Sequence, residues 1–61
     1  MKVKEIIKLI EEDGWQYKRT KGSHRVYKHP FKPGAVVVPG KLSKQLAIGT
    51  EISILKQAKL K

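Results

Sequence analysis

The sequence predicts an α+β fold of two layers in the order α-β-β-β-α, in which two helices cover one face of a three-stranded antiparallel sheet. Amphipathic stripes near the two ends of the chain predict the helices, and three short β-rich runs between them predict the strands. Because short turns join consecutive strands, these should pair as an antiparallel meander. With both helices on one face, the other face of the sheet is expected to stay open to water.

An aliphatic stripe that stops at a glycine predicts the first helix. Val3, Ile6, Ile7 and Ile10 have the i, i+3, i+4, i+7 spacing of one helix face. Gly14 then stands where helices commonly place the C′ residue that ends them. We expect this stripe to form part of the core.

The predicted strands are Trp15–Thr20, Ser23–His29 and Ala35–Val38. Trp15 and Tyr17 share a face by alternation, and we expect both in the core because so short a chain has few large apolar groups. In the second strand each face carries one apolar residue, so periodicity leaves open which face is buried. His29 comes just before a proline-rich turn and is expected to be an ordinary turn residue.

A loop from Lys41 to Ala47 precedes the second predicted helix. This helix should begin near Gly49, with Thr50 as its N-cap. Its apolar positions are Ile52, Ile54, Leu55 and Ala58.

Length and composition restrict the class of protein. The 61 residues are expected to form one domain, residues 1–61, with a small core, since such a chain buries only about 60% of its unfolded surface. The absence of cysteine excludes disulfides and thiolate metal sites. No apolar run is long enough to cross a membrane, and the N-terminal segment lacks the apolar core of a signal peptide. We therefore expect a cytoplasmic protein.

The charge is large and unevenly distributed. The formal net charge is +9 at pH 7, and no acidic residue occurs from Gly14 to Thr50. Eight basic residues lie in the same stretch: Lys18, Arg19, Lys21, Arg25, Lys28, Lys32, Lys41 and Lys44. This asymmetry indicates a polyanion-binding surface. A membrane surface is a poorer partner, because no basic amphipathic helix carries the charge.

The stretch Lys21-Gly22-Ser23-His24-Arg25 contains the groups needed to hold a phosphodiester and move a proton beside it. Gly22 permits close approach to the backbone, and Ser23 with the neighbouring N–H groups can bind a phosphate oxygen. His24 can exchange a proton near neutral pH, and the flanking cations can hold negative charge. By itself such a stretch is also typical of a basic turn that enters a strand.

Several kinds of catalysis are disfavoured by the sequence. The carboxylates are separated from the histidines, and no HExxH pattern or glycine-rich nucleotide loop occurs, so neither a metal nor another cofactor is expected. Adjacent Ser23 and His24 are poorly placed for a Ser–His–Asp triad. RNA scission requires less, because the RNA supplies its own 2′-OH nucleophile. One histidine to move the proton and cations to stabilise the phosphorus oxygens are sufficient.

These motifs, in this order, resemble the HicA family of toxin components, small mRNA interferases that pair with HicB antitoxins. Lys21-Gly22-Ser23-His24 matches the most specific motif of the family. Further matches are Asp13-Gly14-Trp15, His29-Pro30, Lys32-Pro33-Gly34, Val38-Pro39, Gly49-Thr50 and the segment Ile54-Leu55-Lys56-Gln57-Ala58. Lys59 differs, because the family usually has glycine there.

The resemblance implies a fold like a double-stranded-RNA-binding domain and ribosome-independent cleavage of mRNA, a single-stranded RNA, with His24 as the catalytic residue. It also implies a HicB-like antitoxin as partner. The residues expected to contact the substrate are Lys21, Gly22, Ser23, Arg25 and Lys28. A second proton carrier is not identified, and His29, a lysine or water remain open.

Two other functions fit parts of the sequence. A non-catalytic RNA-binding module would use the same basic surface, and only the histidine motif argues against it. A small DNA-binding regulator fits less well, because no helix-turn-helix pair is visible.

Overall fold

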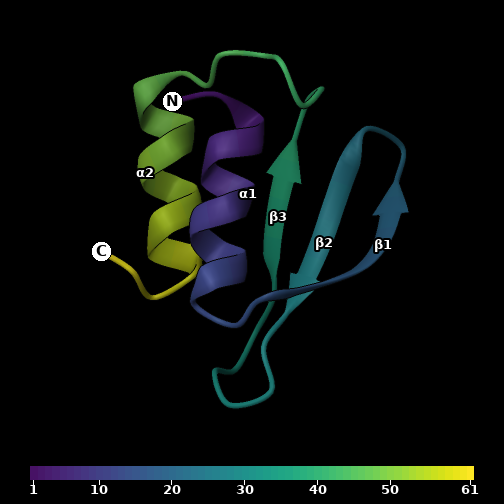
Figure 1. Cartoon of the computed structure of the whole chain (residues 1–61), viewed down its shortest axis with the longest axis vertical. Coiled ribbons are helices and arrows are strands. Elements are labelled where there is room, and N and C mark those ends of the chain that lie inside the picture. The colour runs from purple at the N-terminus through teal and green to yellow at the C-terminus, as the bar shows by residue number, and fades with distance from the viewer.

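The computed structural model describes residues 1–61 and confirms the predicted α+β order (Figure 1). The elements are α1 (Val3–Glu12), β1 (Gln16–Lys21), β2 (His24–Lys28), β3 (Val36–Pro39) and α2 (Ile48–Gln57). The sheet has the order β1-β2-β3, and both strand pairs are antiparallel. Each strand end differs by one residue from the range predicted by the sequence. No helix is long and apolar enough to cross a membrane.

Helix α1 forms as its stripe predicts and ends in a Schellman motif. Val3, Ile6, Ile7 and Ile10 are all buried. Gly14 has a φ of 108° and donates its N–H to the Glu11 carbonyl, while the next N–H donates to the Ile10 carbonyl. These two bonds satisfy carbonyls that the helix end leaves unpaired. The expectation that Gly14 ends the helix is confirmed.

Helix α2 begins earlier than predicted, so Thr50 is not its N-cap. The N-cap is Ala47, which has extended backbone and no side-chain capping bond, and its carbonyl accepts the Glu51 N–H at 2.9 Å. Thr50 therefore lies within the first turn. Leu46 is buried just before the helix, so core packing and not a capping side chain determines where α2 begins.

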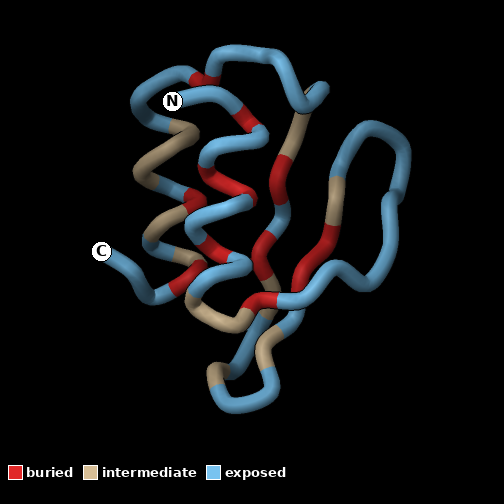
Figure 2. The backbone as a smooth tube through the Cα atoms, viewed as in Figure 1, coloured by how far each residue is buried: buried red, intermediate tan, exposed pale blue.

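One core lies between the two helices and a single face of the sheet (Figure 2). The sheet contributes Tyr27, Val36 and Val38, and Trp15 closes the core beside α1 with 1% of its surface exposed. Ile54 and Ala58 of α2 are buried against the same cluster. Tyr27 identifies the buried face of β2, which alternation had left open.

The helices pack mainly against β3, so they do not cover β1 (Figure 1). All six residues of β1 are exposed. Tyr17 contacts Tyr27 edge to face but stays 52% exposed, so the expectation that Tyr17 belongs to the core is wrong. The far edge of β3 is partly blocked, because the Val37 N–H donates to the Gln57 side-chain oxygen of α2.

Gly14 and Gly49 form a matched pair for testing these contacts. A Cβ added at Gly14 would lie 2.7 Å from the His29 Nε2 atom, and the backbone of this residue has positive φ. A Cβ added at Gly49, within α2, would meet nothing within 4 Å. We expect Gly14→Ala to lower the free energy of unfolding by about 2 kcal/mol or more. Gly49→Ala should raise it by about 0.5–1 kcal/mol. Urea unfolding of both variants measures the difference, and equal effects would contradict the packing described.

Lys59 takes a left-handed conformation, with φ of 60°, in a second Schellman motif at the end of α2. Left-handed backbone costs a non-glycine residue about 1–2 kcal/mol, while a cation near a helix C-terminus contributes about 0.3–1 kcal/mol. Lys59→Gly should therefore stabilise the protein by about 0.5–1 kcal/mol and raise Tm by a few degrees. Lys59→Ala loses the charge and keeps the strain. Thermal unfolding that shows no difference between the two variants would refute this account.

Candidate functional site

His24 is exposed at the first position of β2, beside the turn that joins β1 to β2. The strand register pairs it with Lys21 on one side and with Pro39 on the other. Residues directly opposite each other in antiparallel strands point to the same face. Lys21, His24 and Pro39 therefore form one row across the sheet, on the face that the helices leave open.

The turn beside His24 consists of Gly22 and Ser23. Gly22 has a φ of 62°, and Ser23 does not have positive φ. Glycine with positive φ at the first position is typical of a type II′ turn, whose twist suits a two-residue hairpin. A Cβ at Gly22 would meet no atom within 4 Å, so a ligand can approach this backbone freely. The turn and the imidazole thus face solvent together.

The register places three cations on the open face with His24. Lys21 lies in the His24 row, Arg19 pairs with Val26 in the next row, and Lys28 pairs with Gln16 further along. Sequence reasoning included Lys21 and Lys28 among the site residues but omitted Arg19. Residues two apart in a strand point to the same face, so the position of Arg19 two residues before Lys21 is the sequence signal that identifies it. We call Arg19, Lys21, His24 and Lys28 the open-face cluster.

Arg25 does not share this face. It pairs with Thr20 and Val38 on the helix side of the sheet and is only partly exposed. Its Nη1 atom donates to the Gly40 carbonyl at 2.7 Å, and the Gly40 N–H donates to the Ser23 carbonyl at 3.2 Å. Arg25 therefore fastens the end of β3 to the hairpin that carries His24.

His29, the other histidine, is held in place by hydrogen bonds between its ring and the backbone. Its Nδ1 atom accepts hydrogen bonds from the N–H groups of Phe31 and Lys32, so this nitrogen carries no proton in the structure. The Nε2 atom therefore carries the proton and donates it to the Asp13 carbonyl at 2.7 Å. The side chain is 7% exposed and lies edge-on to Trp15. With both nitrogens engaged and little access to solvent, His29 is unsuited to exchange protons with a substrate.

Three further contacts complete this arrangement, which we call the His29 junction. The Lys32 ammonium donates to the Asp13 carboxylate, and Lys32 also reaches the Ala58 carbonyl at 3.3 Å. The Trp15 indole N–H donates to the same carbonyl at 3.2 Å. The junction therefore joins the ends of both helices to the turn between β2 and β3.

The Asp13 carboxylate should make stability depend on acid pH. The hydrogen bond from Lys32 lowers the pKa of Asp13 below its ordinary value of 3.8, partly opposed by desolvation. Because the folded-state pKa is the lower one, this stabilisation is present above the unfolded pKa and is lost as pH falls through the folded pKa. The difference in unfolding free energy between the parent and Asp13→Asn should therefore shrink below about pH 4.

Chemical unfolding at several pH values measures that difference. Glu12→Gln is the control, because the neighbouring Glu12 is exposed and forms no ion pair. A gap between parent and Asp13→Asn that stays constant from neutral to acid pH would contradict the assigned role of the ion pair.

The fold and this surface define a class: small basic α+β proteins that carry an exposed histidine at a glycine hairpin. No group of three or more His, Cys, Asp or Glu side chains that could hold a metal ion comes together in the structure. A comparison with protein families matches residues 3–60 to the HicA toxin of bacterial toxin–antitoxin systems. The chain therefore belongs to the HicA toxin family, whose members are RNases and whose toxins imply an antitoxin partner. A search of curated proteins gave no match.

Proposed function

We propose that this protein is a metal-independent endoribonuclease that inhibits translation by cutting mRNA through the 2′-OH of the RNA. The observation that carries the proposal is the exposed His24 imidazole on a sheet face that bears cations and no carboxylate. Membership of a family of RNases supports the same activity.

In this mechanism His24 moves the proton of the 2′-OH as that oxygen attacks the phosphorus. The bond between the phosphorus and the 5′ oxygen breaks, which leaves a 2′,3′-cyclic phosphate and a 5′-OH. General base catalysis by a positioned side chain contributes about 10²–10⁴-fold. Lys21, directly opposite in the same row, stabilises the charge that develops on the phosphoryl oxygens. The open Gly22–Ser23 turn offers backbone N–H groups and a hydroxyl to the same phosphate.

The remaining residues position the RNA or the catalytic groups. Arg19 and Lys28 lie along the open face and hold neighbouring phosphates. Arg25 acts by positioning, because its bond to Gly40 keeps the end of β3 beside the hairpin. The departing 5′ oxygen takes up a second proton. Since both nitrogens of His29 are bonded within the junction, water or a lysine such as Lys21 supplies that proton.

The partner in this proposal is a HicB-like antitoxin that covers the open-face cluster. The antitoxin partner follows from the family, and the carboxylate-free cationic face suits an acidic protein surface. Covering His24 and its cations would block access of RNA without any change in the fold.

The test measures RNA affinity and cleavage rate for the same variants. His24→Ala alters an exposed side chain, so stability should change by less than about 0.5 kcal/mol. RNA affinity should also change little, whereas the cleavage rate should fall at least about 100-fold. Cleavage by the parent should persist in EDTA and should spare an RNA with a single 2′-deoxy nucleotide at the cut site.

Arg19→Ala is the control, because it removes a cation and leaves the proposed proton carrier. It should weaken affinity and reduce the slope of log K against log salt by about 0.7 for each lost single-strand phosphate contact. An unchanged cleavage rate in His24→Ala would remove the proposed catalytic group. Inhibition of translation that follows affinity and survives His24→Ala would instead establish a non-catalytic RNA-binding module.

A further inference from the structure

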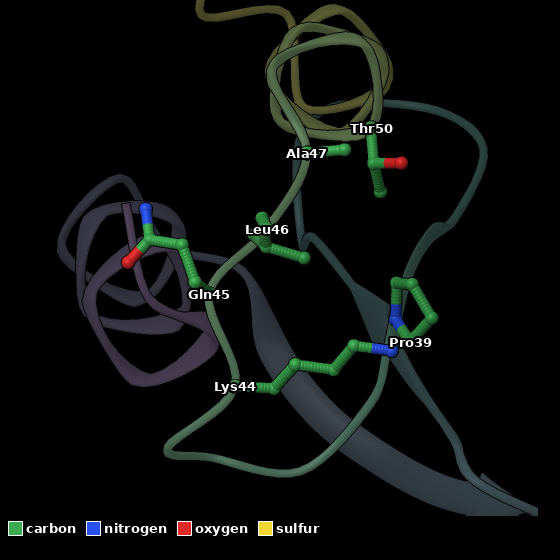
Figure 3. Close-up of a pocket in the computed structure, with 6 residues that line it drawn as sticks. All are labelled: Pro39, Lys44, Gln45, Leu46, Ala47 and Thr50. Atoms are coloured by element: carbon green, nitrogen blue, oxygen red, sulfur yellow. The ribbon is translucent and has the colours of Figure 1, made fainter.

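A pocket lies between the end of β3 and the start of α2, and one of its lining residues is Pro39 of the proposed catalytic row (Figure 3). Its volume is about 200 Å³, and its lining consists of Pro39, Lys44, Gln45, Leu46, Ala47 and Thr50. Pro39 is the cross-strand partner of His24, so the pocket and the imidazole flank the same β2–β3 pair. Directly opposite residues of antiparallel strands have Cα atoms about 4.5–5.5 Å apart. Pro39, directly opposite His24, is therefore the residue through which the pocket borders the proposed catalytic row.

The pocket walls are held in place before any ligand arrives. The loop that supplies Lys44 and Leu46 is fixed by two backbone bonds, from the Val3 N–H to the Lys44 carbonyl and from the Leu46 N–H to the Met1 carbonyl, each 2.9 Å long. Leu46 is also buried in the core. On the other side, the bond from Arg25 to Gly40 secures the chain next to Pro39. A preformed pocket costs little ordering entropy on binding.

The lining combines apolar surface with groups suited to a nucleotide. In Figure 3, Pro39, Leu46 and Thr50 surround the opening, and the Lys44 side chain extends toward Pro39. A Cβ at Gly40 would lie 3.2 Å from the Lys44 Cδ atom, so this side chain packs along the backbone beside Pro39. No carboxylate lines the pocket. An apolar wall can cover the face of a ring, and an ammonium group and a hydroxyl at the rim can bind polar groups of a base or a phosphate.

The size of the pocket restricts the ligand further. Pockets for drug-sized molecules have about 300–1,000 Å³, so about 200 Å³ suits a single ring system. Proteins that recognise single-stranded RNA commonly splay bases out of the strand and contact their exposed edges. We propose that this pocket holds the nucleobase of a nucleotide that flanks the scissile phosphate. This inference rests on the proposed function for the identity of that phosphate, but base binding can be measured without cleavage.

The probe is a short RNA whose 2′-OH groups are all methylated, so that no position can be cut, and in which each nucleotide in turn is replaced by an abasic one. Loss of one base should weaken binding to the parent by at least about fivefold, the effect of removing about 40 Å² of apolar surface from water. Ala47→Leu fills the pocket from the N-cap of α2 and should abolish this sensitivity to the lost base. Gly49→Leu adds the same side chain in the same turn outside the pocket and should keep it.

Thr50→Val gives a second test, since it keeps the shape of the pocket and removes the hydroxyl. It should change which base is preferred at the sensitive position, with total affinity for a mixed RNA changed less than twofold. If no abasic position weakens binding, or if Ala47→Leu and Gly49→Leu respond alike, the proposal is wrong. Because this test measures binding alone, its result can be interpreted even if the protein does not cleave RNA.

Discussion

The hydrogen bonds of the His29 imidazole are the interaction on which the rest of the structure depends. The ring accepts two backbone N–H groups from the β2–β3 turn and donates to the carbonyl at the end of α1. It packs so close to Gly14 that no side chain fits there. Lys32 and Trp15 extend the junction to the end of α2. Three segments distant in sequence are thereby held at one end of the molecule, opposite the hairpin that begins β2 (Figure 1).

That arrangement gives the two histidines opposite environments. His29 has both ring nitrogens bonded and little exposure, whereas His24 stands exposed at the other end of β2. A chain of 61 residues supports only a small core, and here the helices cover β3 and part of β2 while β1 stays exposed on both faces. The cations of β1 are therefore not needed for packing. Mutual repulsion among them is tolerated because the core and the His29 junction lie elsewhere.

The sequence predicted what depends on local pattern. The order of elements, the buried stripe of α1, the Gly14 terminus and the burial of Trp15 all follow from spacing and backbone preference. The exposure of Tyr17, the start of α2 and the buried face of β2 depend on which strands the helices cover, which alternation alone does not determine. A bulge between Tyr17 and Arg19 changes the alternation within β1 itself. For the candidate site, the motif identified His24, and the two-residue spacing from Lys21 was the overlooked signal for Arg19, whereas the pocket beside Pro39 required the tertiary structure.

The open-face cluster and the pocket also differ in what they can recognise. Lysine and arginine contacts to phosphates give affinity and orientation but carry no direct sequence information. A surface made only of the open-face cluster would therefore bind any RNA, and sequence preference requires contacts to base edges. Among the features beside His24, the pocket bordered by Pro39 is the one that is both concave and chemically mixed. In the proposed mode of binding, the base in the pocket is the source of any sequence preference, and the cations supply the affinity that is common to all sequences.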